Sequence, residues 1–232
     1  MTKALFLFAL IAAMAQPPAS RVQRLTFRTA DGTTVLYGRS IPGGYDPRQP
    51  RPLVLVLHPG GERIPYYGDR VMQQIFLPGL GALDAIMVAP DCPTRAWSDP
   101  AAEQAVRALI DNVIAEYAVD RRRILVTGFS LGGSGTWFMS SHHADLYTAA
   151  IVLAGRTDEP LERLAKIPTY IIHSRDDEVV PFAQAERRAA ELNSMGRVVK
   201  FEALQGLGHY AMRGYVGALE RAGRWVTEHW EK

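Results

Sequence analysis

Arg123-Ile-Leu-Val-Thr-Gly-Phe-Ser-Leu-Gly-Gly133 is the stretch that decides the fold of this chain. It places Ser130 in the pattern G-x-S-x-G, directly after a short apolar run. With a strand before it and a helix after it, this pattern predicts a sharp turn that exposes the serine hydroxyl at the edge of a sheet. Gly128 and Gly132 flank the turn, where a Cβ atom would collide with the neighbouring strand or helix. The apolar run before Ser130 and the helical run over 134–142 supply the required context.

Apolar runs alternate with segments of helical spacing along the chain. Continuous apolar runs are typical of strands buried on both faces, and Asp31-Gly32 between two shorter segments indicates a leading antiparallel hairpin. The alternation predicts an α/β fold with a mostly parallel central sheet and helices on both faces. We expect strands at 21–28, 33–40, 53–57, 85–89, 124–127, 149–153, 169–173 and 198–203, and helices at 101–117, 134–142, 182–192 and 210–229.

Composition limits the class of protein. The 232 residues are 47% hydrophobic, enough to bury one full core. The 26 basic and 24 acidic residues nearly balance, and no Lys/Arg-rich block is present, so nucleic acid is not an expected partner. Cys92 is the single cysteine, which excludes an internal disulfide, and we expect it to be a small buried residue at a strand end. The absence of a Cys/His cluster favours chemistry without a metal or another cofactor.

The first residues resemble a cleaved export signal. Lys3 gives a short positive start, 4–12 is apolar, and Ala13-Met-Ala15 is a small-x-small pattern that signal peptidases cleave. The apolar stretch is too short to span a bilayer comfortably, and no lipid-attachment cysteine follows it, so no stable membrane anchor is expected. The sequence therefore predicts a signal peptide at 1–15, cleavage near Ala15, and a periplasmic or extracellular domain at 16–232.

A nucleophilic serine needs a base, and the base needs an orienting acid. With a G-x-S-x-G turn the partners follow in the order serine, acid, histidine, each on a loop after a strand. His209 in Gly206-Leu-Gly-His-Tyr210 has the position of the base. The acid is expected after the strand at 169–173, where Asp176 and Asp177 are both present. Asp158, after an earlier strand, is a third candidate.

Two further segments carry a family resemblance. Ile172-His-Ser-Arg-Asp-Asp-Glu-Val-Val-Pro181 resembles the H-G-x-x-D-x-x-V-P motif of α/β-hydrolases in the dienelactone hydrolase, esterase and prolyl oligopeptidase-like group. The resemblance implies that Asp177 is the acid, with Ser174 replacing the usual glycine. The segment 88–97 is similar to the A-P-x-C-P…W pattern of secreted esterases and predicted peptidases in that group. The resemblance implies an α/β-hydrolase fold, and the short connection 153–169 predicts a minimal lid or none, and hence an open site.

The oxyanion of an acyl-transfer reaction requires waiting N–H donors. The amide of Leu131, directly after the serine, is the first expected donor. The second is expected in His58-Pro-Gly-Gly-Glu62, which resembles the oxyanion loop of the same family. Pro59 has no N–H, so Gly60 is the preferred donor and Gly61 the next.

Four aromatic residues are candidates for substrate binding. Trp97 is expected near the carboxyl ends of the strands, where ligands bind in such sheets, but a buried role is equally open. Tyr66 and Tyr67 form a pair in the loop after the oxyanion segment, with the same alternative, and Tyr210 follows the expected base. Glu62, Arg63 and Arg95 are expected to border the site, which leaves a preference for charged substrates open.

These residues favour a serine hydrolase that cleaves carboxylic esters, either of small molecules or carried on a polymer. A serine peptidase of the prolyl oligopeptidase-like type is the alternative enzyme, although the extra domain typical of such peptidases is absent. A binding protein built on a hydrolase fold is a third hypothesis, since a fold does not imply an activity. The complete set of serine, acid and histidine favours an enzyme.

Overall fold

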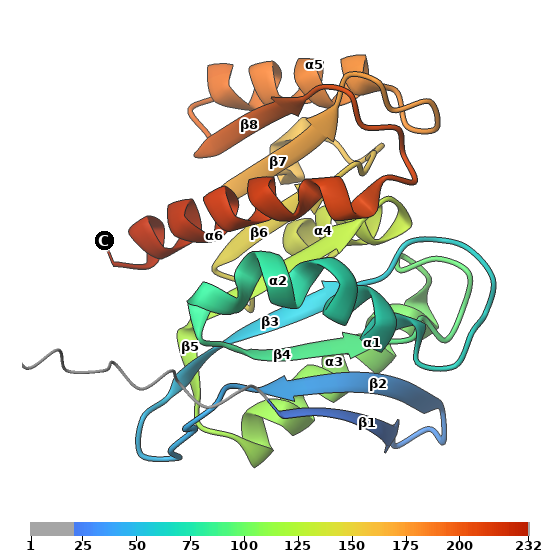
Figure 1. The fold of residues 1–232 in the computed structure, drawn as a ribbon, viewed down its shortest axis with the longest axis vertical. Helices are drawn as coiled ribbons and strands as arrows, with labels where there is room; N and C mark the ends of the chain where they lie inside the picture. Colours follow the sequence, from blue (N-terminus) through green and yellow to red (C-terminus); the bar gives the residue numbers. More distant parts are fainter. Residues whose placement is uncertain (1–20, 232) are drawn as a thin grey trace, which may run out of the picture.

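The computed structural model describes residues 21–231, which form an eight-stranded sheet in the order β1-β2-β4-β3-β5-β6-β7-β8 (Figure 1). The hairpin strands β1 and β2 pair antiparallel, β2 joins β4 antiparallel, and the remaining strands are parallel. Every strand expected from the sequence is present. Their bounds are β1 Arg21–Arg28, β2 Thr34–Ile41, β3 Arg51–Leu57, β4 Ile86–Pro90, β5 Val119–Phe129, β6 Ala149–Leu153, β7 Thr169–Ser174 and β8 Val199–Leu204.

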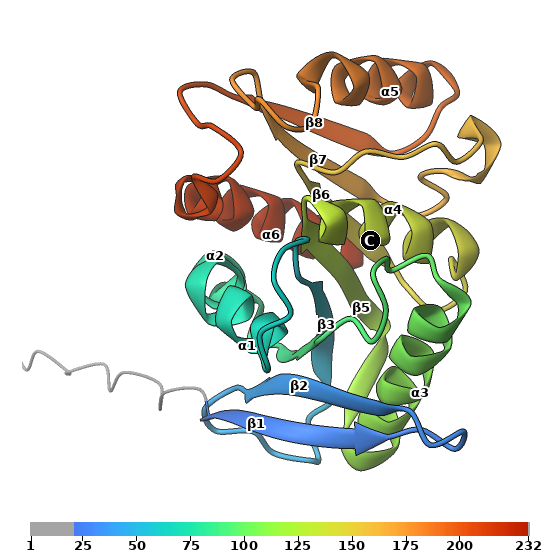
Figure 2. The ribbon, with the colours of Figure 1, turned by 90° about the vertical axis from the view of Figure 1, so that its right-hand side faces the viewer.

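Helices cover both faces of the sheet, as Figures 1 and 2 show. On one face lie α1, α2 and α6, and on the other α3, α4 and α5. Because both faces are covered, the central strands are buried on both sides, which explains their continuous apolar runs. The helical elements are α1 Tyr67–Val71, η1 Met72–Phe76, α2 Leu77–Leu80, η2 Gly81–Leu83, α3 Pro100–Glu116, α4 Leu131–His142, η3 Leu161–Arg163, α5 Phe182–Ser194, η4 Met212–Tyr215 and α6 Val216–Trp230.

The segment between β3 and β4 was not predicted to be helical. Residues 67–83 form the consecutive elements α1, η1, α2 and η2. Glycine and proline weaken any helical pattern there, and tertiary packing stabilises the segment instead. Gly79 lies so close to α6 that a Cβ atom on it would come within 2.5 Å of the Leu219 Cβ. This approach to α6 fixes the helical segment against the sheet.

The closing helix begins later than the sequence predicted. Residues 210–215 were expected to be α-helical, but α6 starts at Val216, after the short helix η4. The preceding loop turns at Gly206, which has a positive φ of 74°. Residues 205–211 therefore form a turning loop that carries His209, and the expectation of a helix beginning at Tyr210 was wrong.

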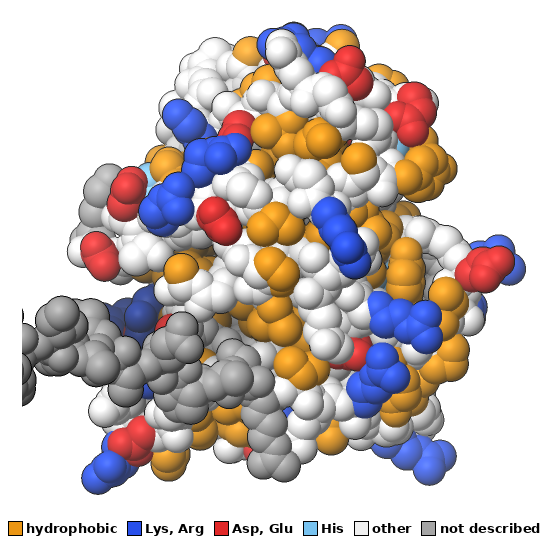
Figure 3. All heavy atoms as spheres, viewed as in Figure 1, with side chains coloured by type: hydrophobic (Ala, Val, Ile, Leu, Met, Phe, Trp, Pro, Cys, Tyr) orange, Lys and Arg blue, Asp and Glu red, His pale blue; other side chains and the backbone are white. Residues whose placement is uncertain are grey.

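The face seen in Figure 3 carries acidic and basic side chains interspersed among apolar ones, as the near-balanced composition predicts. Across residues 21–231, no helix is both long and apolar enough to cross a membrane. The expected signal peptide at 1–15 lies outside the described residues.

Candidate active site

Ser130 occupies a strained turn between β5 and α4. Its φ of 56° and ψ of −115° lie in a region that non-glycine residues rarely adopt. A Cβ atom on Gly128 would lie 2.7 Å from the Leu57 carbonyl oxygen, so only glycine fits beside the neighbouring strand. The Ser130 N–H donates to the Leu153 carbonyl at 2.9 Å, which ties the turn to β6. The turn has the geometry that the G-x-S-x-G pattern predicts.

Three loops bring the expected catalytic residues together. The Ser130 Oγ lies 2.8 Å from Nε2 of His209, and Nδ1 of His209 lies 2.8 and 3.0 Å from the two carboxylate oxygens of Asp177. Ser130 follows β5, Asp177 lies after β7, and His209 lies after β8. The three side chains thus form one continuous hydrogen-bonded chain. In this arrangement Asp177 fixes the imidazole tautomer that leaves Nε2 free to accept the serine proton.

The Asp177 carboxylate is buried and fully hydrogen-bonded. Its side chain is 0% exposed, and its Oδ1 accepts the backbone N–H groups of Val179 at 2.9 Å and Val180 at 2.8 Å. Burial opposes ionisation, but the hydrogen bonds from His209 and these two amides outweigh it, so the pKa of Asp177 lies below its ordinary value. The carboxylate therefore stays ionised beside the imidazole.

His173 packs beside the Asp177 carboxylate. Its Nε2–H donates to the Val180 carbonyl at 2.9 Å, and the same nitrogen lies 3.4 Å from Oδ2 of Asp177. Burial lowers the pKa of His173, which keeps the ring neutral. The sequence indicated only that this histidine ends a strand. Its position four residues before Asp177 was the available signal, because a turn after β7 brings the two side chains together.

The neighbouring carboxylates hold the histidine loop rather than the imidazole. Oδ2 of Asp176 accepts the Gly206 N–H at 2.6 Å, and Oε2 of Glu178 accepts the His209 N–H at 2.9 Å. Asp158 is exposed and makes no hydrogen bond to His209. Of the three candidate acids, the geometry favours Asp177.

A clamp of three residues fixes the expected oxyanion loop. The His58 Nε2 accepts the Cys92 N–H at 2.9 Å, so its Nδ1 carries the proton and donates to the Pro59 carbonyl at 2.6 Å. The Trp97 indole N–H donates to the His58 carbonyl at 3.0 Å. Burial lowers the pKa of His58 and keeps it neutral, as this pattern requires. The clamp holds the backbone that leads into Gly60.

The expected oxyanion donors lie side by side. A Cβ atom on Gly60 would be 3.7 Å from the Leu131 Cβ, which places the loop after β3 against the turn after Ser130. Gly61 has a φ of 145°, a conformation that side chains rarely adopt. This adjacency is what two convergent donors require.

The aromatic candidates separate into two groups. Tyr67 and Tyr210 line the cavity above Ser130, and Tyr210 is 81% exposed. Trp97 is 1% exposed and lines neither cavity of the site, because its ring packs beneath the His58 segment. Tyr66 also lines neither cavity. Direct substrate contact by Trp97 or Tyr66 therefore has no structural support, and Tyr67 belongs to α1 rather than to a loop.

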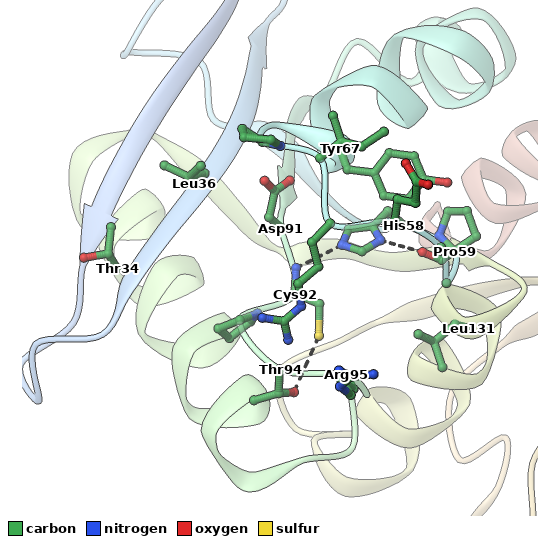
Figure 4. Close-up of a pocket in the computed structure, with 17 residues that line it drawn as sticks. Thr34, Leu36, His58, Pro59, Tyr67, Asp91, Cys92, Thr94, Arg95 and Leu131 are labelled. Carbon is green, nitrogen blue, oxygen red and sulfur yellow. Dashed lines mark hydrogen bonds between the residues drawn. The ribbon is translucent and has the colours of Figure 1, made fainter.

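Two adjoining cavities open at the carboxyl ends of the strands. One, of about 530 Å³, contains Ser130 and His209. The other, of about 620 Å³, lies between the loops after β3 and β4 and includes Cys92, Thr94 and Arg95 (Figure 4). Cys92 was expected to be buried, but it is half-buried in this wall. Within 21–231 no cluster of three or more His, Cys, Asp or Glu side chains could hold a metal ion.

Known proteins resemble this chain in sequence and in fold. Feruloyl esterase C of Emericella nidulans is 28% identical over 156 residues, which are 62% of this chain and 56% of that protein. The chain therefore spans little more than half the length of this curated relative. A crystal structure described as a thermostable esterase superimposes with a TM-score of 0.75 at 26% identity, covering 89% of this chain and 62% of the other.

A feruloyl esterase module from Clostridium thermocellum, solved with sinapinate, has the same fold. It covers 88% of this chain and 89% of the module, with a TM-score of 0.71 and 17% identity. The fold is thus that of the α/β-hydrolases, as the sequence resemblance implied. The phospholipase/carboxylesterase family model matches residues 88–221, which include the serine turn, the acid loop and the histidine loop. That match covers more than half of the chain, so the chain belongs to the phospholipase/carboxylesterase family.

Proposed function

We propose that this protein hydrolyses carboxylic esters through an acyl-enzyme formed on Ser130. The hydrogen-bonded chain from Ser130 through His209 to Asp177 carries the proposal. Such a chain converts a weakly nucleophilic hydroxyl into one that transfers its proton as it attacks. The family to which the chain belongs, described as phospholipase/carboxylesterase, supports esters as the substrate class.

In the proposed mechanism, the Ser130 Oγ attacks the ester carbonyl carbon while Nε2 of His209 takes the hydroxyl proton. Asp177 stabilises the resulting imidazolium. The amides of Leu131 and Gly60 donate to the oxyanion, with Gly61 as the alternative donor. When the intermediate collapses, the C–O bond to the alcohol breaks and His209 protonates the departing oxygen. Water then attacks the acyl-enzyme with His209 again as the base, which releases the acid and restores Ser130.

The substrate is expected to be a small ester or an ester carried on a polymer. A cavity of about 530 Å³ contains the serine, and an adjoining cavity of about 620 Å³ leaves room for a substituent on the other side of the scissile bond. Tyr67 and Tyr210 offer aromatic contacts in the cavity that holds the serine. The feruloyl esterases among the relatives make methyl ferulate a suitable aromatic probe beside alkyl esters.

The test is hydrolysis of p-nitrophenyl esters from acetate to octanoate, and of methyl ferulate, by the chain beginning at Gln16. Ser130→Ala is the matched control. We expect hydrolysis by the parent protein and loss of roughly 10⁴-fold or more in kcat for the variant. A fluorophosphonate probe should label the parent protein and not the variant.

Equal rates for the parent and Ser130→Ala would contradict the proposal. The peptidase alternative is tested with matched peptide p-nitroanilides. Serine-dependent cleavage of these amides, without cleavage of any ester, would favour the peptidase. Failure of both substrates and of labelling would favour a binding protein.

We also propose that residues 1–15 act as an export signal. The proposal rests on the Lys3 start, the apolar run and the Ala13-Met-Ala15 pattern. Expression of the full chain in a bacterial host and N-terminal sequencing of the periplasmic product tests it. A mature protein beginning near Gln16 is expected, whereas full-length protein retained in the cytoplasm would contradict the proposal.

A further inference from the structure

The two cavities of the site share one wall. Pro59, Gly60, Gly61, Tyr67 and Leu131 line both, so the cavities meet at the expected oxyanion donors. Ser130 and His209 line only the smaller cavity. An ester carbonyl held between Gly60 and Leu131 would therefore have the smaller cavity on one side and the larger cavity on the other.

The mechanism determines which cavity holds the alcohol group of the ester and which holds the acyl group. The departing alcohol must lie near the His209 Nε2, because that nitrogen protonates it. His209, Val179, Tyr210 and Met212 line only the smaller cavity, which is therefore the alcohol side. The acyl group is bonded to the same carbon and points away from the alcohol. It leads past Leu131 and Tyr67 into the larger cavity.

The outer wall of the larger cavity contains two arginines, Arg63 from the loop after β3 and Arg95 from the loop after β4. Figure 4 shows Arg95 beside Thr94 on the Leu131 side of the cavity. Burial raises the pKa of the Cys92 thiol in the same wall, and hydrogen bonds from Thr94 oppose the rise more than the charge of Arg63 does. Neither guanidinium lies within ion-pair distance of a carboxylate among residues 21–231.

Two acidic residues, Asp91 and Glu62, line the same cavity. Both oxygens of Asp91 accept backbone N–H groups, from Tyr66 at 2.6 Å and Gly68 at 2.9 Å, so that carboxylate is occupied at the start of α1. Glu62 is exposed and makes no ion pair within the described chain. His58 is kept neutral by burial, which lowers its pKa. The larger cavity is thus lined by two guanidinium groups without an ion pair within 21–231 and by two carboxylates, of which only Asp91 is held by backbone amides.

We propose that the larger cavity is the acyl subsite and that Arg63 and Arg95 select acyl groups ending in a carboxylate, as in monoesters of dicarboxylic acids. This inference rests on the proposed ester hydrolysis and adds the substrate class. Arginine matches a carboxylate through paired N–H donors. The free carboxylate of such a substrate would lie between the two loops while its ester carbonyl lies at Ser130.

The test compares two p-nitrophenyl esters of adipic acid by the release of p-nitrophenol. In one the second carboxyl group is free and charged. In the other it is methylated, so the acyl chain is the same without the charge. The rate with Ser130→Ala is subtracted from each. For the parent protein we expect a higher kcat/KM with the charged ester. The Arg63→Gln/Arg95→Gln double variant should lower the charged-to-neutral ratio by about three- to tenfold, because exposed charge pairs contribute modestly. The ratio in the parent should also fall as salt is raised to 0.5 M.

Two further variants test whether the effect has the expected direction and whether it depends on charge inside the cavity. Glu62→Gln should raise the charged-to-neutral ratio, because it removes one of the two negative charges of the wall. Arg187→Gln, on α5 and outside both cavities, should leave the ratio as in the parent.

The possible failures are distinguishable. If the parent hydrolyses both esters but prefers the neutral one, or if the double variant does not change the ratio, the charge-selecting subsite is overturned while ester hydrolysis stands. If neither adipate ester nor any alkyl ester is hydrolysed faster than with Ser130→Ala, the proposed function itself fails.

Discussion

His209 and Ser130 are 79 positions apart in the chain, and the His209 Nε2 lies 2.8 Å from the Ser130 Oγ. Three consecutive acidic residues after β7, Asp176 to Glu178, hold this contact in place, and each has a different hydrogen-bond partner. Asp177 binds the imidazole, while Asp176 and Glu178 accept backbone N–H groups of the histidine loop at 2.6 and 2.9 Å. The three residues therefore fix both the ring and the loop that carries it.

These different partners predict different effects of two similar substitutions. Asp177→Asn should lower kcat for p-nitrophenyl butyrate by about 10³- to 10⁴-fold, because an amide no longer enforces the required imidazole tautomer. Asp176→Asn retains an oxygen for the Gly206 N–H and should lower kcat less than about tenfold. Steady-state kinetics, with circular dichroism as a check of folding, measures both. A larger loss in Asp176→Asn would reassign the acid.

The serine turn predicts a stability difference between two glycines. A Cβ atom on Gly132 would collide with the Leu57 carbonyl oxygen, whereas one on Gly81 meets nothing within 4 Å. Gly132→Ala should lower the free energy of unfolding by roughly 1–3 kcal/mol or more through overpacking. Gly81→Ala should change it by less than about 1 kcal/mol. Urea unfolding of the two variants tests this, and equal effects would contradict the close approach of β3.

Two buried histidines predict a loss of stability on acidification. Burial lowers the pKa values of His58 and His173 below the ordinary 6.5, so the folded rings stay neutral while the unfolded rings take up protons. Below about pH 6.5 the unfolded state binds more protons, and stability falls with pH. We expect Tm to decrease from pH 7 to pH 5, and to decrease less in His173→Gln and His58→Gln. If Tm fell with pH as steeply in both variants as in the parent, the two histidines would not be the cause of the lost stability.

A second loss of stability is expected at lower pH. The pKa of Asp177 is below its ordinary value of 3.8, because hydrogen bonds outweigh the effect of burial. Its ionisation therefore stabilises the fold above pH 3.8, and that contribution is lost as the pH falls through the lowered pKa. Asp177→Asn should remove this part of the acid transition when Tm is followed from pH 4.5 to pH 2.5.

The exposure of Tyr210 predicts an effect on substrate without an effect on folding. The side chain is 81% exposed and its ring meets His209 edge to face at 5.5 Å, on the proposed alcohol side. Tyr210→Ala should raise KM for p-nitrophenyl esters by about two- to tenfold, because the aromatic contact between Tyr210 and the p-nitrophenyl ring is lost. KM for methyl esters, which lack that ring, should stay unchanged. Tm should stay within a degree or so of the parent, since surface substitutions change stability little. Tyr66→Ala, outside both cavities, is the control and should leave KM unchanged.

The sequence alone was sufficient for the α/β fold, the eight strands and the order of the expected catalytic residues. Continuous apolar runs, G-x-S-x-G and the histidine loop are local signals, because strand burial and turn strain act on neighbouring residues. Gly128 and Gly132 were identified by the same local reasoning, and the structure confirms their tight surroundings.

Tertiary structure decided what depends on distant packing. Helix α1 depends on contacts with β2 and β4, and α2 depends on contacts with α6, so propensity did not reveal them. Two adjacent aspartates have the same chemistry, and only the family resemblance favoured Asp177; the loop after β7 turns the Asp177 carboxylate toward His209. Trp97 is buried and does not line a cavity of the site. Arg63 and Arg95 lie on different loops but line the same cavity. The sequence determined which chemical groups are present and their order, whereas the packing of separate loops decided which groups face each other, because those contacts join residues far apart in the chain.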